Sequence, residues 1–354
     1  GQVVPADILH ALLGGHDALA GDVIRCIRQQ HLTLGHTHEQ RFVGQALVGQ
    51  LGQGTHRIKA LSRRPDQASE VLGPAVEAVD LNDDDALRKA IDGADLVVNL
   101  AGENVSGGRW SRARKQRLWD SRVIVTERIV AAIEQAQSPP HLLINASAVG
   151  IYGDTGEEIA SESSDAATGF LASLCVAWEE AAARAETLGV RVLHLRMGVV
   201  VGQGGGALKV LIPLFRKGLG GPIGSGQQWM SWIHVEDLVQ IVMAAMEDER
   251  FQGPINAVSP VPIRNSFFTE ALASSLGASS RMAVPGILLR WGLGEASSML
   301  LDSSRVDGQR LRELGFEYSY PTLEKALLQV ATENAPAVDS RPPGANPTPE
   351  GKPQ

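Results

Sequence analysis

A short apolar run ends in residues small enough to admit a ligand. Residues 96–98 are Leu, Val and Val without polar alternation, which is typical of a strand buried on both faces. Asn99, Leu100, Ala101 and Gly102 follow, and small residues at the end of such a strand let a flat ligand approach the backbone. Because ligands of open α/β sheets lie beyond the carboxyl ends of the strands, this is a candidate binding site. The alternative is a buried strand followed by an ordinary glycine turn.

The composition narrows the kind of ligand. The 354 residues carry a formal charge of −8 with a pI near 5.6, which disfavours a nucleic-acid or anionic-membrane surface. No apolar run reaches membrane-spanning length. Cys26 and Cys175 form neither a disulfide framework nor a metal-binding pattern, so we expect no metal and a reducing compartment, the cytoplasm or an organelle stroma. We therefore expect a small-molecule partner, and the oligomeric state stays open.

Helical and strand patterns alternate from residue 42 onward. The amphipathic patterns that predict helices cover residues 43–51, 83–91, 112–135 and 169–188. The apolar runs that predict strands cover residues 56–61, 95–100, 141–146 and 191–195. Because strands alternating with helices pack as a parallel sheet with helices on both faces, we expect an α/β, doubly wound fold.

The two ends of the chain have a different character. Residues 1–41 show no clear pattern, although residues 23–27 could be helical. Glycine-rich stretches and short helices after residue 201 suggest a smaller α/β lobe, and the polar end with its six prolines is expected to be disordered. The expected parts are an uncertain N-terminal segment, 1–41; a dinucleotide-binding domain, 42–201; a C-terminal substrate-side lobe, 202–332; and a disordered tail, 333–354.

Several motifs occur in a recognisable order between about Phe42 and Val330. Asn99-x-Ala101-Gly102 ends one strand, and Ser147 precedes a Tyr152-Gly153 pair after another. A long glycine-rich run at 218–226 then leads into Trp-Ile-His-Val-Glu-Asp at 232–237. Together these motifs resemble the extended short-chain dehydrogenases/reductases, and most closely their atypical epimerase-like group, sometimes labelled cell-division inhibitors. The resemblance implies a Rossmann-type NAD(P)-binding fold with a C-terminal domain of its own.

The glycine turn of that family is incomplete here. The resemblance implies Gly-x-x-Gly-x-x-Gly, where a pyrophosphate lies against backbone N–H groups at a helix N-terminus. The corresponding positions are His38, Arg41 and Gly44, so only the last glycine is present. Either the chain has lost ordinary cofactor binding, or the first 41 residues come from a shifted reading frame or a mispredicted start.

A codon argument supports the second alternative. Residues 39–41, Glu-Gln-Arg, can be written GAG CAA CGG, and one base out of phase the same letters contain codons for Ala and Thr. Relatives commonly have Gly-Ala-Thr-Gly-Phe-Val-Gly here, and Phe-Val-Gly follows directly at residues 42–44.

Basic residues after the second predicted strand indicate which dinucleotide binds. An acid at this place suits the ribose hydroxyls of NAD, whereas an arginine suits the additional phosphate of NADP. Arg63 and Arg64 stand there, so we expect NADP(H) rather than NAD(H). The resemblance assigns further contacts to Gly44 and to residues 99–102, and Arg196 is a further candidate for cofactor binding. The alternative is two solvated arginines on a turn.

The catalytic signature of the superfamily is absent. Its reductases transfer a proton through a tyrosine whose pKa is lowered by a lysine four residues later. Tyr152, Tyr318 and Tyr320 are the only tyrosines, and none has a lysine at that spacing. Ser147 matches the superfamily's catalytic serine and Tyr152 could supply a phenol from another direction, so these two are the catalytic candidates. The alternatives are that Ser147 satisfies backbone groups and that Tyr152 packs in the core.

One substitution bears on the substrate. Relatives that act on nucleotide sugars carry an arginine, which holds the diphosphate, at the position of Met230. Trp229 and Trp232 make the expected substrate site more apolar, so we expect a small or apolar substrate, although Arg196 or Arg109 could compensate for the missing charge.

The leading function is an NADP(H)-binding epimerase-like oxidoreductase of unknown substrate. The alternative is a non-catalytic nucleotide-binding regulator that binds a partner protein.

Overall fold

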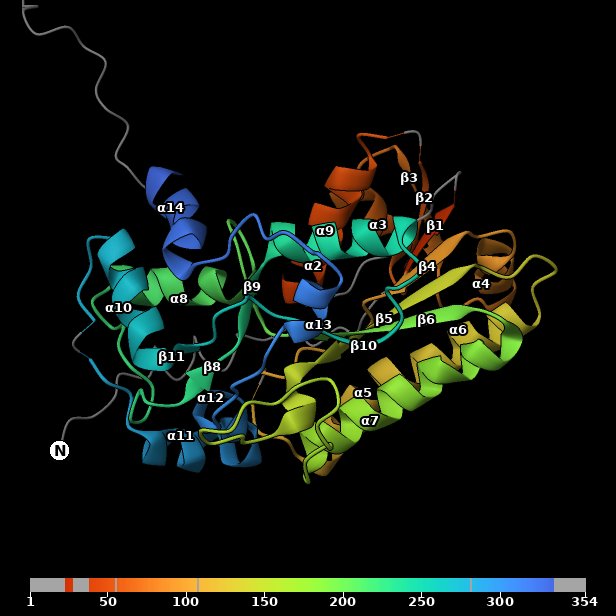
Figure 1. The fold of residues 1–354 in the computed structure, drawn as a ribbon. Coiled ribbons are helices and arrows are strands. Elements are labelled where there is room, and N and C mark those ends of the chain that lie inside the picture. The colour runs from red at the N-terminus through yellow and green to blue at the C-terminus, as the bar shows by residue number, and fades with distance from the viewer. Residues whose placement is uncertain (1–22, 28–37, 55, 107, 281, 334–354) are drawn as a thin grey trace, which may run out of the picture.

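The computed structural model describes residues 23–27, 38–54, 56–106, 108–280 and 282–333 (Figure 1). Within them, a seven-stranded sheet has the order β10-β6-β5-β4-β1-β2-β3. Read from the other edge, strands β3, β2, β1, β4, β5 and β6 follow the 3-2-1-4-5-6 order of dinucleotide-binding folds. The strands are β1 (Val23–Ile27), β2 (Arg57–Ser62), β3 (Val76–Asp80), β4 (Leu96–Asn99), β5 (Leu142–Ala148), β6 (Arg191–Met197) and β10 (Gly253–Ala257).

The predicted doubly wound α/β fold is confirmed, with one strand reversed. All neighbouring pairs are parallel except those of β1, which runs antiparallel to both β2 and β4. Ile24 lies opposite Ala60 on one side and Val98 on the other. The prediction of a helix at 23–27 is therefore wrong, because this Val-Ile-Arg-Cys-Ile segment is rich in β-branched residues and fills a gap in the sheet.

The reversal of β1 has a consequence for the cofactor edge. Its first residue pairs with Leu61 at the carboxyl end of β2, and its last pairs with Arg57 at the amino end. Strand β1 therefore ends at the edge opposite the one where dinucleotides bind. Its other neighbouring segments, residues 1–22 and 28–37, lie outside the described residues, as does the predicted tail from residue 334 onward.

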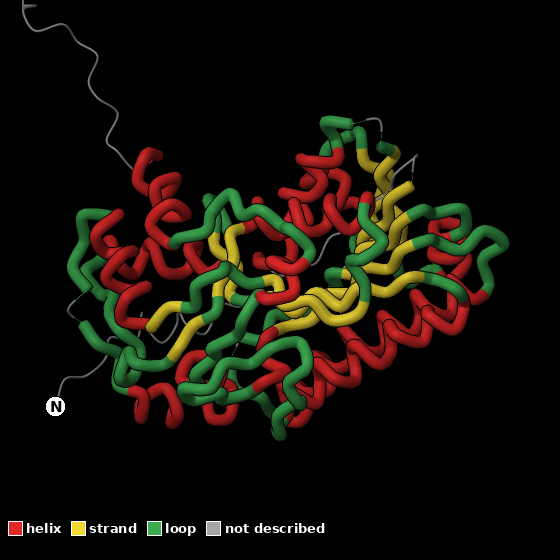
Figure 2. The backbone as a smooth tube through the Cα atoms, viewed as in Figure 1, coloured by secondary structure: helices red, strands yellow, loops and turns green. Residues whose placement is uncertain are grey.

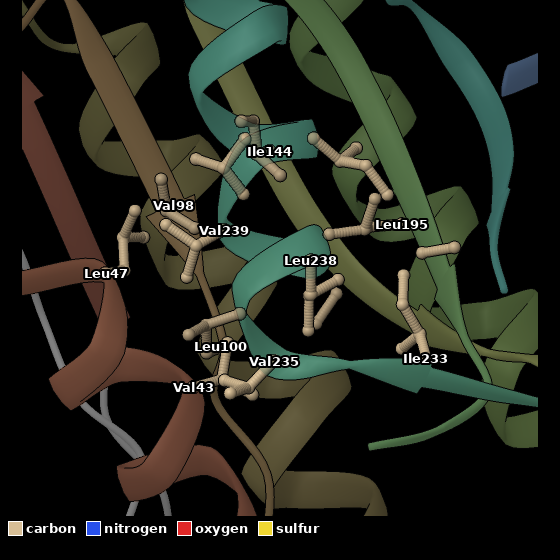
Figure 3. Packing of buried hydrophobic residues seen from close by; sticks show 14 of the residues in the cluster. Val43, Leu47, Val98, Leu100, Ile144, Leu195, Ile233, Val235, Leu238 and Val239 are labelled. Carbon is tan, nitrogen blue, oxygen red and sulfur yellow. The ribbon is translucent and has the colours of Figure 1, made fainter. Parts of the chain in front are cut away.

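Helices cover both faces of the sheet, as Figures 1 and 2 show. On one face, Val98, Ile144 and Leu195 pack against α2 and α9 (Figure 3). On the other, Val97 and Leu143 pack against α4, α6 and α7. The helices of the first layer are α2 (His38–Leu51), α3 (Pro65–Leu72) and α9 (Val235–Glu247), and those of the second are α4 (Asp84–Ile91), α5 (Arg112–Trp119), α6 (Val125–Glu134) and α7 (Phe170–Ala183).

Several predicted elements differ in their limits. The predicted helix at 112–135 is α5 and α6 joined by a π-helical turn, η1 (Asp120–Ile124). Helix α2 begins at His38 rather than at residue 43, and α3 and β3 were not predicted. Short 3₁₀ turns are η2 (Val149–Tyr152), η3 (Arg184–Leu188) and η4 (Gly294–Ser297).

Most of the remaining elements form a smaller lobe beside the sheet, on the left in Figure 1, whereas α13 (Gln309–Glu313) lies near the centre and packs against β10. The helices of the lobe are α8 (Gly206–Arg216), α10 (Asn265–Ser275), α11 (Gly286–Leu293), α12 (Ser298–Leu301) and α14 (Leu323–Glu333). Its strand pairs are β7 (Val199–Val201) with β9 (Trp232–His234) and β8 (Trp229–Met230) with β11 (Ile263–Arg264). Strand β10 lies beyond residue 201 yet belongs to the large sheet, so the chain crosses between the two parts more than once.

The glycine-rich stretch at 202–206 has a packing role. A Cβ atom on Gly205 would overlap the ring of Phe42 in α2, and one on Gly202 would also meet that ring. Gly206 has φ +58° and faces the carbonyl of Val200. The stretch therefore lets the start of α8 approach α2. In the described part of the chain, no helix is both long and apolar enough to cross a membrane.

Candidate cofactor and active site

Polar side chains line up across the carboxyl ends of four parallel strands. Asn99 of β4 lies opposite Asn145 of β5, and Ser147 of β5 lies opposite Arg196 of β6, which in turn faces Asn256 of β10. Residues in register point to the same face of a sheet, here the face that α6 and α7 cover. The topology thus brings three predicted site residues, Asn99, Ser147 and Arg196, to one edge.

Asn99 uses its side chain to hold the edge together. Its amide nitrogen donates to Thr126 Oγ1 at 2.7 Å and to Asn145 Oδ1 at 2.7 Å, and its oxygen accepts from the backbone N–H of Ala101 at 3.0 Å. Trp178 Nε1 also donates to Thr126 Oγ1, at 3.0 Å. Both amide hydrogens are therefore engaged inside the protein. Of the predicted motif, residues 100–102 therefore remain as candidate cofactor contacts. The hydrogen bond from Ala101 to the Asn99 side chain shapes this segment.

The loop after this segment is held by the π-helical turn. Ser121 Oγ accepts from the backbone N–H of Glu103 at 2.8 Å, and Arg122 Nη2 donates to the backbone carbonyl of Glu103 at 3.0 Å. The Glu103 carboxylate accepts from Arg114 and Arg117, each at 3.3 Å. The extra residue of a π turn re-aims side chains, and such turns are frequent at functional sites. Here the turn points Ser121 and Arg122 at this loop.

The two catalytic candidates belong to one buried network. Ser147 Oγ donates to Glu179 Oε1 at 2.5 Å, and Arg196 binds both Glu179 oxygens, at 2.9 and 2.8 Å. Arg196 Nη1 also donates to the Tyr152 hydroxyl at 2.8 Å, and that hydroxyl donates to Asn256 Oδ1 at 2.7 Å. The five residues are between 0% and 9% exposed.

The charges of this network compensate one another. Burial opposes ionisation of Glu179, but hydrogen bonds from Arg196 and Ser147 hold the pKa of its carboxyl below the usual value. Burial raises the pKa of Tyr152, and the neighbouring Arg196 only partly opposes that rise. The phenol is therefore neutral at physiological pH. All three guanidinium nitrogens of Arg196 donate inside the protein, so the structure gives Arg196 partners other than the predicted cofactor.

Helix α7 contains neither a tyrosine nor a lysine. Leu171 packs against Gly150 after β5, and the thiol of Cys175 hydrogen-bonds beside Ser147 and Ala148. These two residues are four apart on the face of α7 turned to the end of β5, the spacing of Tyr-x-x-x-Lys. Burial raises the pKa of Cys175 to about 11, so its thiol is neutral. Helix α7 therefore carries neither the tyrosine nor the lysine of such a pair.

The predicted dinucleotide contacts lie at two further places. Arg64 directly precedes α3 at the carboxyl end of β2, and its backbone N–H donates to Ser62 Oγ at 2.9 Å. Its half-buried guanidinium has no partner among the described residues. Arg63 is its neighbour. Gly44 is buried inside α2 rather than in a strand-to-helix turn.

The His-Val-Glu-Asp segment has a structural role. His234 caps α9, since its Nδ1 accepts from the backbone N–H of Glu236 at 3.3 Å. Asp237 accepts from the backbone N–H groups of Ser319 and Tyr320 at 2.6 and 3.0 Å. Among the described residues, no three His, Cys, Asp or Glu side chains gather closely enough to hold a metal ion.

Three residues of this site, Glu179, Asn256 and Thr126, were not predicted from the sequence. A signal existed for Glu179, because a carboxylate on the buried stripe of a predicted helix requires a partner. For Thr126 and Asn256 the sequence offers no comparable signal, since their contacts join residues that are 27 and 104 positions apart.

The strand order, the two helix layers and the polar carboxyl edge define a dinucleotide-binding α/β protein. The chain belongs to the NAD dependent epimerase/dehydratase family, whose sequence model matches residues 38–257. A second match, to a domain of unknown function (DUF1731), covers residues 284–330.

Relatives come from plants, bacteria and animals. The chain is 36% identical over 304 residues to the "Epimerase family protein SDR39U1 homolog, chloroplastic" of Arabidopsis thaliana, covering 85% of this chain and 87% of that protein. It is 38% identical to "Epimerase family protein Mb2239" of Mycobacterium bovis, with 80% and 93% covered. The solved structure of human epimerase family protein SDR39U1 (isoform2) with NADPH is 32% identical and superposes with a TM-score of 0.74, covering 82% of this chain and 96% of that one.

Proposed function

We propose that the chain binds NADP(H) at the carboxyl edge of the sheet and acts as an epimerase-like oxidoreductase on a small, weakly polar molecule. The observation that carries the proposal is Arg64, a cation without a partner among the described residues, at the end of β2. An arginine at this place suits the 2′-phosphate that distinguishes NADP from NAD. The human relative solved with NADPH supports the same choice.

The described residues fit such a cofactor in part. The guanidinium of Arg64 binds the phosphate. Ala101 and Gly102, which are buried, have at most a methyl group beside the backbone. When bound, a nicotinamide supplies or accepts a hydride. A glycine turn for the pyrophosphate is not present in the described residues, because Gly44 lies within α2 and β1 is reversed.

In this proposal Tyr152 supplies the proton that accompanies hydride transfer. Its hydroxyl exchanges Asn256 for the substrate oxygen, donates its proton there, and is reprotonated from water. Arg196, 2.8 Å away, stabilises the phenolate that remains. Ser147 orients the substrate oxygen. Met230, at the position where nucleotide-sugar enzymes have arginine, favours substrates without a diphosphate.

A second candidate function is a non-catalytic, NADP(H)-binding regulator. It is favoured by the engagement of both candidate hydroxyls in a buried network and by the lack of a tyrosine and a lysine in α7. In such a protein the network would stabilise the nucleotide-bound shape that a partner protein recognises.

A titration tests the shared part of both candidates. NADPH and NADH are titrated into wild type, Arg64→Gln and the control Arg57→Gln, whose arginine is exposed and paired with Glu77. Arg64→Gln should weaken NADPH binding roughly tenfold and leave NADH binding unchanged, because one charge-assisted phosphate contact is lost. An equal loss for both nucleotides, or no NADPH binding at millimolar concentration, contradicts the proposal.

Turnover separates the two candidates. NADPH oxidation is followed with a panel of aldehydes and ketones, with UDP-sugars as the comparison. The enzyme candidate predicts turnover of small carbonyl compounds that Tyr152→Phe abolishes without changing NADPH affinity. Intact NADPH binding without any turnover favours the regulator instead.

A further inference from the structure

A pocket of about 400 Å³ opens between α5 and the beginning of α7. It is lined by Trp110, Arg112, Lys115, Gln116, Trp119 and Phe170. Three of these residues are aromatic and three are charged or polar, and the pocket is open to solvent on one side.

This pocket uses a different face of α5 from the one that supports the cofactor edge. Arg114 and Leu118 are buried, and Arg114 donates to the Glu103 carboxylate and to the carbonyl of Asn104. Arg112, Lys115 and Trp119 recur at intervals of three and four residues and so form a separate stripe. The pocket therefore lies outside the network proposed for catalysis.

The aromatic walls are held in place. The rings of Trp110 and Phe170 meet edge to face with centroids 5.3 Å apart. Trp110 Nε1 donates to the carbonyl of Val105 at 2.9 Å, which fixes the indole. Lys115 Nζ lies 4.9 Å from the centre of the Phe170 ring and pairs with Glu295. A planar guest could therefore stack on a wall that needs little reordering.

Two donors of the pocket, the guanidinium of the exposed Arg112 and the indole N–H of the partly exposed Trp119, have no protein partner among the described residues. Since Glu295 compensates Lys115, Arg112 supplies one uncompensated positive charge. It is also the first residue of α5, where the helix dipole disfavours a cation. An anion held there would remove this unfavourable interaction.

We propose that the α5–α7 pocket binds a small planar aromatic carboxylate, separately from NADP(H). The ring stacks among Trp110, Trp119 and Phe170, and the carboxylate accepts from Arg112 and from the indole N–H of Trp119. A single uncompensated cation matches a monoanion better than a phosphate dianion. The proposal goes beyond the function proposed above and does not depend on it.

Calorimetry with three probes tests the chemistry. The probes are 2-naphthoate, the neutral 2-naphthylmethanol with the same rings, and cyclohexanecarboxylate with the same charge but no aromatic ring. We expect 2-naphthoate to bind at least about tenfold more tightly than either comparison, with or without saturating NADPH. No 2-naphthoate binding at millimolar concentration, or equal affinity for the three probes, overturns the proposal.

Variants locate the site. Arg112→Gln and Trp119→Ala should each weaken 2-naphthoate binding about tenfold, whereas the controls Lys217→Gln and Trp291→Ala, both outside the pocket, should not. NADPH binding should be unchanged in all four, so this test can fail independently of the cofactor proposal. Unchanged 2-naphthoate affinity in Arg112→Gln places the site elsewhere and overturns the proposal. A changed sedimentation coefficient of ligand-free Arg112→Gln would identify the pocket as a contact between copies and also overturn it.

Discussion

At the scale of single residues, the ion pair between Glu179 and Arg196 decides how the carboxyl edge is held. Replacing Glu179 by Gln leaves a buried guanidinium without its counter-charge and also weakens the acceptor for Ser147. Breaking a buried pair in this way costs about 3 kcal/mol or more. We expect that loss in the free energy of unfolding from urea titration. The control Glu180→Gln, on the exposed side of the same helix, should change it by less than about 0.5 kcal/mol.

The cap of α9 should make stability depend on pH. Burial lowers the pKa of His234 to about 4, whereas an unfolded histidine titrates near 6.5. Between these values the unfolded chain binds the additional proton, so stability falls as the pH drops from 6.5 to 4, by up to about 3 kcal/mol. His234→Asn keeps the cap acceptor and should remove this part of the fall. The exposed His141→Asn is the control, and an unchanged pH profile in His234→Asn would refute the assignment.

Residue types identified three polar side chains that lie together in the structure, but not the partners that hold them. Asn99, Ser147 and Arg196 were each predicted as site residues, and parallel strands that end together bring them to one edge. Their partners were not predictable, because Thr126, Glu179 and Asn256 reach them only through helix packing and a distant strand. The direct cofactor and catalytic roles of these residues stay predictions.

At the scale of elements, the periodicity of apolar residues predicted most helices and strands from residue 57 to residue 197. It gave the wrong state for residues 23–27, which form β1. Buried strands and amphipathic helices carry their own pattern, whereas a five-residue segment such as β1 takes its state from the neighbours it pairs with. The π-helical turn η1 was also not predictable from the sequence, because one additional residue within an unbroken apolar stripe leaves the helical periodicity intact.

The reversed β1 bears on the reading-frame hypothesis. The family match begins at residue 38, and the described strand before it runs against its neighbours. If the frame is shifted, the coding DNA upstream of Phe42 should encode an apolar strand followed by Gly-x-x-Gly in another frame. A chain made from that frame should bind NADPH more tightly than this one. If no frame encodes such a segment, the hypothesis is wrong.

The contact between α2 and α8 depends on the absence of a side chain. Gly205→Ala would drive a methyl group into the ring of Phe42 and should cost roughly 1–3 kcal/mol of unfolding free energy. Phe42→Leu in the same chain should recover part of that loss, because the smaller side chain leaves room. Independent effects of the two substitutions in a double-mutant cycle would show that this contact does not hold the elements together.

At the scale of the whole molecule, Asp237 joins the sheet layer to the C-terminal lobe. The 1% exposed carboxylate on α9 receives the backbone N–H groups of Ser319 and Tyr320, and the ring of Tyr320 stacks on His234 with centroids 3.7 Å apart. The segment that it holds leads directly into α14. The chain passes between the two parts more than once, so they stay together without Asp237. These hydrogen bonds instead position the C-terminal end of the lobe against the sheet layer.

Asp237→Asn should therefore loosen one part of the molecule before the rest. The amide offers a single acceptor without charge, so one charge-assisted bond is lost and another weakened, at a cost of about 2 kcal/mol. We expect faster cleavage by a broad-specificity protease between residues 314 and 322, with NADPH affinity unchanged. Glu247→Gln, exposed at the other end of α9, is the control. Cleavage that accelerates equally along the whole chain would mean that Asp237 stabilises the fold globally, and the separate opening of the lobe would be refuted.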